Sequence, residues 1–191
     1  MPRGGGTREQ ILGTAMRLFV EQGYDKTSLR EIAEAVGVTK AALYYHFRTK
    51  DELVSSALAE YRDAVAEIVA WLRATPPSLE RNEGFVDRMT ELMASDGGLA
   101  LRFGQANPTL AEREEFGTTH VDAVRSLVEA LVGPDPDADA AIRGTMAFGA
   151  LVIGALGNAV LPIPGGPEPG AAAGRTVALE VLAPLADRLH G

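Results

Sequence analysis

Residues 37–50, with the sequence GVTKAALYYHFRTK, constrain the fold more than any other part of this 191-residue chain. Gly37 ends one helical pattern and fits the left-handed backbone conformation that stops a helix. Thr39 can cap a second helix, in which Leu43 and Phe47 point inward on one face. Two helices joined by so short a turn form a helix-turn-helix.

The helix before this turn is expected over residues 28–36 and has a well-defined start. The Ser28 hydroxyl can accept a hydrogen bond from the Glu31 N–H, while Glu31 reaches back to the Ser28 N–H, which together make a capping box. Its apolar residues recur at helical spacing: Leu29, Ile32, Ala33 and Val36. The pattern predicts an amphipathic helix whose small Ala33 lets a second helix cross closely.

Residues from about 7 to 58 resemble the tetracycline-repressor (TetR) family of bacterial transcription regulators. Three parts carry the resemblance: residues 28–37, the run Leu43-Tyr44-Tyr45-His46-Phe47 followed by Lys50, and the earlier set Ile11, Ala15, Leu18, Phe19, Gly23 and Tyr24. It covers little more than a quarter of the chain. The remainder is therefore interpreted from its own pattern.

The resemblance implies that the second helix of the motif reads double-stranded operator DNA. A major groove about 12 Å wide admits one helix, so exposed residues near its start reach the bases. Lys40 can donate to guanine, the Ala41 methyl can touch thymine, and tyrosine hydroxyls can donate to phosphates. The implied DNA-binding residues are Ser28, Arg30, Thr39, Lys40, Ala41, Tyr44, Tyr45, His46 and Lys50.

The charge is unevenly distributed along the chain, whose net charge is −8. Residues 1–50 carry 8 Lys and Arg against 5 Asp and Glu, a net +3, whereas residues 51–191 carry 10 against 21, a net −11. The phosphate backbone repels an acidic domain, which leaves the basic segment to make the DNA contact. Alternatively, the acidic surface only promotes solubility.

Apolar periodicity beyond residue 50 predicts an all-α fold of about nine helices, three of them in the N-terminal domain. The six later helices are expected over residues 51–74, 79–94, 99–105, 110–132, 138–161 and 170–189. Residues 1–50 are predicted to form the DNA-binding domain, with the helix-turn-helix at about 28–47. Residues 51–191 are predicted to form a helical domain for effector binding and dimerisation.

The last helix predicts a homodimer. It has an apolar stripe with little remaining chain to cover it: Val177, Val181, Leu182, Leu185 and Leu189. Two copies can pack their last two helices as a four-helix bundle, which is a common solution for such stripes. The alternative is that the stripe packs only within its own chain.

A small, mostly apolar effector is the expected ligand of the second domain. Apolar and aromatic side chains with a few polar groups are typical of ligand cavities. The candidate lining is Trp71, Met89, Met93, Phe103, Phe116, His120, Met146 and Phe148, with Arg102, Gln105, Asn107 and Asn158 as polar anchors. The alternatives are a DNA-binding regulator without an effector, and ordinary core roles for these residues.

Residues 144–163 raise one further alternative, a membrane-associated protein, because a segment of twenty residues without a charge is long enough to cross a bilayer. However, the segment is rich in Gly and Ala, and it has neither an aromatic belt nor a basic flank. We therefore expect no membrane contact and a buried helix, in which Gly149, Ala150, Gly154 and Gly157 allow close packing.

The sequence argues against an enzyme. The chain has no cysteine, and its three histidines, His46, His120 and His190, have no metal-ligand spacing. Residues 165–170 contain prolines that remove the N–H donors a phosphate loop needs, and are expected to form a linker. We predict no catalytic residues, no metal and no cofactor, and, because no secretory signal is evident, a cytoplasmic location.

Overall fold

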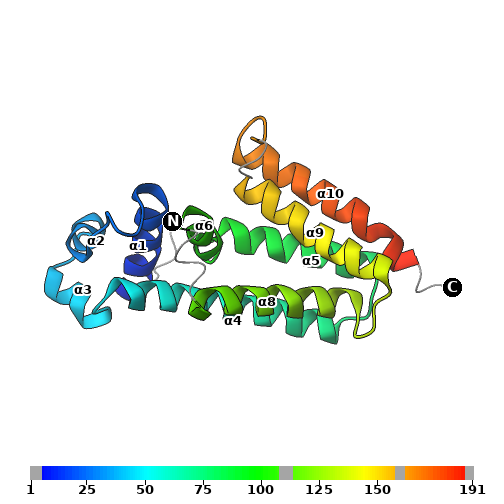
Figure 1. Ribbon diagram of the computed structural model, residues 1–191, viewed down its shortest axis with the longest axis horizontal. Helices are drawn as coiled ribbons and strands as arrows, with labels where there is room; N and C mark the ends of the chain where they lie inside the picture. Colours follow the sequence, from blue (N-terminus) through cyan, green and yellow to red (C-terminus); the bar gives the residue numbers. More distant parts are fainter. Residues whose placement is uncertain (1–5, 108–113, 158–161, 188–191) are drawn as a thin grey trace. The chain divides into compact units, whose positions relative to one another are not determined.

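The computed structural model describes residues 6–107, 114–157 and 162–187, without the side chains of 114–120, 167 and 187. All regular elements in these ranges are helices, nine in number (Figure 1). The predicted all-α class is therefore confirmed. The chain divides into two compact units, residues 1–61 with 95–117 and residues 62–94 with 118–191.

The first unit extends beyond the expected boundary at residue 50. It contains helices α1 (Thr7–Gln22), α2 (Leu29–Val36), α3 (Lys40–His46), the start of α4 (Lys50–Ala74) and α6 (Gly98–Ala106). The apolar faces of these helices meet in one core, which includes Phe19, Leu43, Phe47 and Phe103. Packing of α6 against α1 brings residues 95–117 into this unit, a long-range contact that sequence periodicity does not report. The functional division at residue 50 stays a prediction.

The second unit contains the rest of α4, α5 (Leu79–Ala94), most of α8 (Glu114–Val132), α9 (Ala138–Leu156) and α10 (Pro167–Asp187). Figure 1 shows α9 and α10 side by side. Two glycines allow their backbones to approach closely. A Cβ at Gly154 would lie 2.5 Å from the Gly170 carbonyl oxygen, and one at Gly174 would lie 2.5 Å from that of Ala150. The expected role of Gly154 in close packing is thus confirmed, whereas that of Gly149 and Gly157 is wrong, because a Cβ at either position would meet no atom of the described residues within 4 Å.

Two helix ends differ from the sequence expectation. Helix α9 ends at Leu156 rather than at residue 161, because Gly157 takes a positive φ of 76° that stops the helix. Helix α10 starts at Pro167, inside the expected linker of residues 165–170. Proline suits a first helical turn because its fixed φ is helical and its missing N–H would have no partner there.

Among the described helices, α9 alone is long and apolar enough to cross a bilayer by length and composition. Its buried residues are Ala140, Gly144, Ala147, Phe148, Leu151 and Gly154. Only 33% of its most apolar stretch is buried within the chain, so the expectation of a buried helix is wrong for much of α9, although its Gly154 face packs closely on α10. The absence of membrane contact stays a prediction.

Candidate functional site

The capping box at the start of α2 has the predicted geometry. The Glu31 N–H donates to Ser28 Oγ at 3.2 Å, and the Ser28 N–H donates to Glu31 Oε2 at 2.8 Å. The Ser28 hydroxyl also donates to Oε2, at 2.9 Å. Because the Ser28 N–H and hydroxyl both stabilise the carboxylate, they lower the pKa of Glu31. The start of α2 is therefore closely defined.

The turn between α2 and α3 also matches the expectation. Gly37 has φ 79° in the left-handed region, and its N–H donates to the carbonyl oxygens of Ala33 and Glu34 at 3.0 and 3.2 Å. Thr39 caps α3 by accepting a hydrogen bond from the Ala42 N–H at 3.1 Å. These local bonds set the direction in which α3 leaves the turn.

Helix α3 has one buried and one exposed face. Leu43 and Phe47 are 0% and 1% exposed in the core of the unit, whereas Tyr44 and Tyr45 are 40% and 86% exposed. Lys40 is exposed beside Tyr44, with its Nζ 5.4 Å from the centroid of that ring. The buried Leu43 and Phe47 thus fix the helix so that the hydrogen-bonding side chains on its other face point toward solvent. Contact of these side chains with DNA stays a prediction.

The flanking residues of this surface have internal partners. Arg30 Nε donates to Glu34 Oε1 at 2.7 Å in an exposed ion pair that raises the pKa of Arg30. Lys50 Nζ donates to the Tyr24 carbonyl oxygen at 2.6 Å. His46 is partly buried, and its ring lies edge to face with that of Tyr45, 5.2 Å between centroids. The Arg30 pair uses only the Nε of the guanidinium, and the Arg30 side chain remains 78% exposed.

The residues expected to line an effector cavity are divided between the two units. Phe103 lies in the core of the first unit, and Asn107 Oδ1 there accepts a hydrogen bond from the Tyr24 N–H at 3.3 Å. Arg102 and Gln105 belong to the same unit. These four residues belong to the first unit because α6 packs on α1, and their role in binding an effector stays a prediction. Phe116, His120 and Asn158 fall outside the described side chains.

The remaining candidates belong to the second unit. Met89, Met93 and Phe148 are buried core residues. Trp71 packs its ring against Gly84, and the guanidinium of Arg88 lies 4.0 Å from the ring centroid. Met146 is 56% exposed on α9, and its place in a cavity wall stays a prediction.

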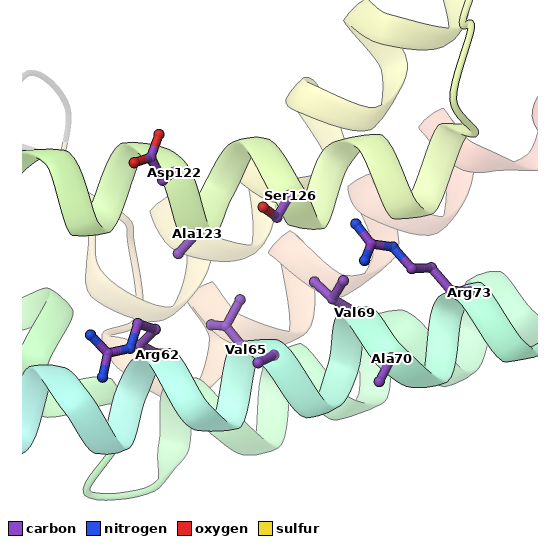
Figure 2. A pocket seen from close by; sticks show the side chains of 9 residues that line it. Arg62, Val65, Val69, Ala70, Arg73, Asp122, Ala123 and Ser126 are labelled. Atoms are coloured by element: carbon purple, nitrogen blue, oxygen red, sulfur yellow. The ribbon is translucent and has the colours of Figure 1, made fainter.

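The second unit has instead a cavity of about 490 Å³ between α4 and α8, drawn in Figure 2. None of the nine predicted lining residues whose side chains the structure describes borders it. Its lining is Arg62, Val65, Ala66, Val69, Ala70, Arg73, Asp122, Ala123 and Ser126. The spacing of these α4 residues, by three and four positions, marks one helical face and was a usable signal. The prediction, which relied on aromatic residues and Met, did not include this face.

The predicted dimer residues on α10 have mixed exposure. Val177 is 45% exposed, whereas Leu182 is fully buried within its own chain; Val181 and Leu185 are partly buried, and Leu189 lies outside the described residues. Helix α9 adds exposed apolar residues that the sequence prediction left out, namely Ile142, Met146 and Ile153 at 59%, 56% and 43%. Their spacing of four and seven positions places them on one face.

Comparison with known proteins identifies the first unit. Residues 11–57 match the model of the bacterial regulatory proteins, tetR family. The HTH-type transcriptional regulator AcrR of Shigella flexneri is 55% identical over 49 residues, or 26% of this chain and 23% of that protein. The HTH-type transcriptional repressor Rv1474c of Mycobacterium tuberculosis is 32% identical over 88 residues, or 46% of this chain and 41% of that protein. The chain thus matches less than half the length of each of these curated relatives.

A solved structure extends the similarity to the whole chain. The crystal structure of Mycobacterium smegmatis AmtR is 28% identical, with a TM-score of 0.59, and the match covers 100% of this chain and 98% of that one. The family match falls on the helix-turn-helix described above, from Ile11 in α1 to Ala57 in α4. On these grounds residues 11–57 belong to the TetR family of bacterial regulatory proteins, and the chain as a whole is similar to a solved regulator structure.

Proposed function

We propose that this protein is a transcriptional repressor that binds a palindromic operator as a homodimer and is released by a small molecule. The observation that carries the DNA-binding part is the two-faced character of α3. Leu43 and Phe47 anchor the helix in the core, while Tyr44 and Tyr45 extend from it into solvent. A helix held in this way presents a rigid row of donors to the major groove. As a DNA-binding regulator, the protein works in the cytoplasm.

Base and phosphate contacts have separate roles in this proposal. Lys40 and Ala41 near the start of α3 contact base edges, which gives sequence preference. Tyr44, Tyr45 and His46, with Lys50 at the start of α4, contact phosphates, which sets the register on the duplex without reading sequence. Ser28 and Arg30 contribute from α2.

The test of DNA binding is a gel shift with the intergenic DNA beside the gene, where a palindrome is expected. The double variant Tyr44→Ala/Lys50→Ala should bind this DNA by about 1–3 kcal/mol more weakly than the unchanged protein. Tyr44→Ala alone should keep the melting temperature, because Tyr44 is exposed, whereas Lys50→Ala also loses the hydrogen bond to Tyr24 and should lower the melting temperature slightly. A duplex of equal length with the palindrome scrambled is the control. Equal affinity of the variant and the unchanged protein would overturn the assignment.

The dimer is proposed from the exposed apolar residues of α9 and α10. Ile142, Met146, Ile153 and Val177 are large apolar side chains in contact with solvent in a single chain. A second copy can cover them by pairing α9 and α10 with their symmetry mates, as in a four-helix bundle. Two recognition helices held about 34–36 Å apart then read successive major grooves on one side of the duplex.

The effector is proposed to bind in the cavity between α4 and α8. Helix α4 is continuous from Lys50 to Ala74, so it includes both the predicted phosphate contact Lys50 and the cavity residues from Arg62 to Arg73. A ligand that tilts this helix changes the spacing of the two recognition helices. For a hundredfold loss of operator affinity, the ligand must bind the DNA-free state more tightly than the DNA-bound state by about 3 kcal/mol.

A further inference from the structure

The cavity between α4 and α8 has an apolar floor and two arginines on one helix face. Val65, Val69 and Ala123 form the floor and are 3%, 7% and 9% exposed. Arg62 and Arg73 are eleven residues apart on α4, which is three helical turns or roughly 16 Å along the axis. Figure 2 shows the two guanidinium groups at opposite ends of this cavity.

The two ends differ in their balance of charge. At the first end, Arg62 lies 3.9 Å from the carboxylate of Asp63, and Asp122 lines the same end from α8 (Figure 2). Asp122 itself accepts a hydrogen bond from Arg125 at 3.0 Å. At the second end, Arg73 has no hydrogen-bond or ion-pair partner among the residues that the structure describes. Uncompensated positive charge is therefore concentrated at the Arg73 end.

A buried arginine adds to the positive charge there. A neighbouring cavity of about 550 Å³ shares Arg73 with the first and is also lined by Arg81, which is only 6% exposed. Arg81 donates to the carbonyl oxygens of Thr75, at 3.3 Å, and of Leu131. These carbonyls carry only partial negative charge.

No carboxylate neutralises this buried guanidinium in the described part of the chain. Its Nε is buried without a partner there, and burial lowers the pKa of Arg81. Glu129 also lines the second cavity, but its exposed carboxylate forms no ion pair with either arginine. A buried cation without a counterion favours an anion nearby, because the low local dielectric strengthens their attraction.

We propose that this cavity binds an anionic amphiphile. Its carboxylate accepts hydrogen bonds from Arg73, and its apolar chain covers Val65, Val69 and Ala123. A planar guanidinium matches a carboxylate with two parallel N–H donors, which an ammonium group cannot do. The inference rests on the proposed effector site and adds the chemical class of the effector, which the apolar lining alone does not specify.

The test is calorimetric titration of the full chain with three probes of equal chain length, each below its micelle concentration. Decanoate should bind more tightly than neutral decan-1-ol and than cationic decylammonium. Arg73→Gln should weaken decanoate binding about tenfold or more, as loss of a charge-assisted pair does. Arg73→Lys keeps the charge and should give an intermediate affinity. Arg62→Gln is the matched control, because Arg62 lies at the end of the cavity where carboxylates balance its charge. It should change the decanoate affinity less than about threefold.

Three results would overturn the proposal: no binding of decanoate, equal or tighter binding of decan-1-ol or decylammonium, or unchanged decanoate affinity in Arg73→Gln. Arg73 is exposed, so the variant should keep the melting temperature of the unchanged protein. A gel shift with decanoate then separates the two hypotheses. Binding that depends on Arg73 but leaves the DNA complex intact supports the ligand class and contradicts the effector role.

Discussion

Lys50 donates a hydrogen bond from its Nζ to the Tyr24 carbonyl oxygen at 2.6 Å, and the same ammonium lies 4.3 Å from the centroid of the Tyr24 ring. Tyr24 also donates from its N–H to Asn107 at 3.3 Å and from its hydroxyl to Asp51 at 2.6 Å. The ring of Phe103 lies 6.0 Å away, edge to face. The end of α6 thus supports the residue that holds Lys50 at the start of α4.

Replacing Lys50 by Ala should weaken DNA binding and reduce its dependence on salt. One phosphate contact contributes about 0.9 to the slope of log affinity against log salt concentration, because one contact releases about that much counterion. The measurement is a salt titration of the gel shift. Lys26→Ala removes the same charge from an exposed position in the same unit and should leave the slope nearly unchanged. Equal slopes for Lys50→Ala and the unchanged protein would contradict the phosphate contact.

Replacing Phe47 by Ala should lower the free energy of unfolding by about 3–5 kcal/mol, because it leaves a cavity in the core of the first unit. Phe47 is 1% exposed and lies beneath the guanidinium of Arg8. Urea unfolding measures the change. Tyr45→Ala is the control, since a side chain 86% exposed should affect stability by no more than about 0.5 kcal/mol. The assignment of Phe47 to the core is wrong if the two variants are equally stable.

Replacing Met146 by Glu should convert the proposed dimer to a monomer. Met146 lies one helical turn after Ile142 on the exposed face of α9, and a carboxylate buried there without a partner opposes association. Sedimentation velocity at micromolar concentration reports the mass. Val121→Glu places the same charge at an exposed apolar position of α8 and should leave the dimer intact. A monomeric unchanged protein would reject the dimer itself.

Stability should fall at alkaline pH because of Tyr61. Burial raises the pKa of Tyr61 from 10.0 to about 12, and the side chain is 2% exposed. As the pH rises above about 10, the phenol ionises in the unfolded chain before it does so in the folded one. Its contribution to stability is therefore complete below pH 10 and is lost toward pH 12. Unfolding free energies should decrease more steeply over this range for the unchanged protein than for Tyr61→Phe, and parallel curves would contradict this.

Local structure in the helix-turn-helix was predictable from sequence because the bonds that define it join near neighbours. Ser28 and Glu31 are three residues apart, as are Thr39 and Ala42, so the capping bonds depend on residue type and spacing alone. Gly37 takes a positive φ for which glycine has no steric cost. The burial of Leu43 and Phe47 likewise follows from helical periodicity.

The candidate ligand cavity was not predictable in the same way, because its walls come from helices distant in sequence. Arg62 to Arg73 on α4 face residues 122–126 on α8 in the second unit. Phe103 and Asn107 are residue types that are common in ligand cavities. Helix α6 packs on α1, however, so both residues belong to the first unit. Apolar side chains fit a core, a cavity or an interface equally well, so residue type does not distinguish among these environments.

By itself, the sequence of this protein determined the helical class, the start of α2, the turn at Gly37 and the two faces of α3, since each depends on backbone conformation and periodicity over a few residues. Only the tertiary structure decided which helices share a core, that Met146 is exposed, and that Arg73 and Arg81 border adjoining cavities. Those features depend on contacts between segments far apart in the chain. Their free energies come from non-directional apolar packing, which many pairings of the same amphipathic helices can satisfy.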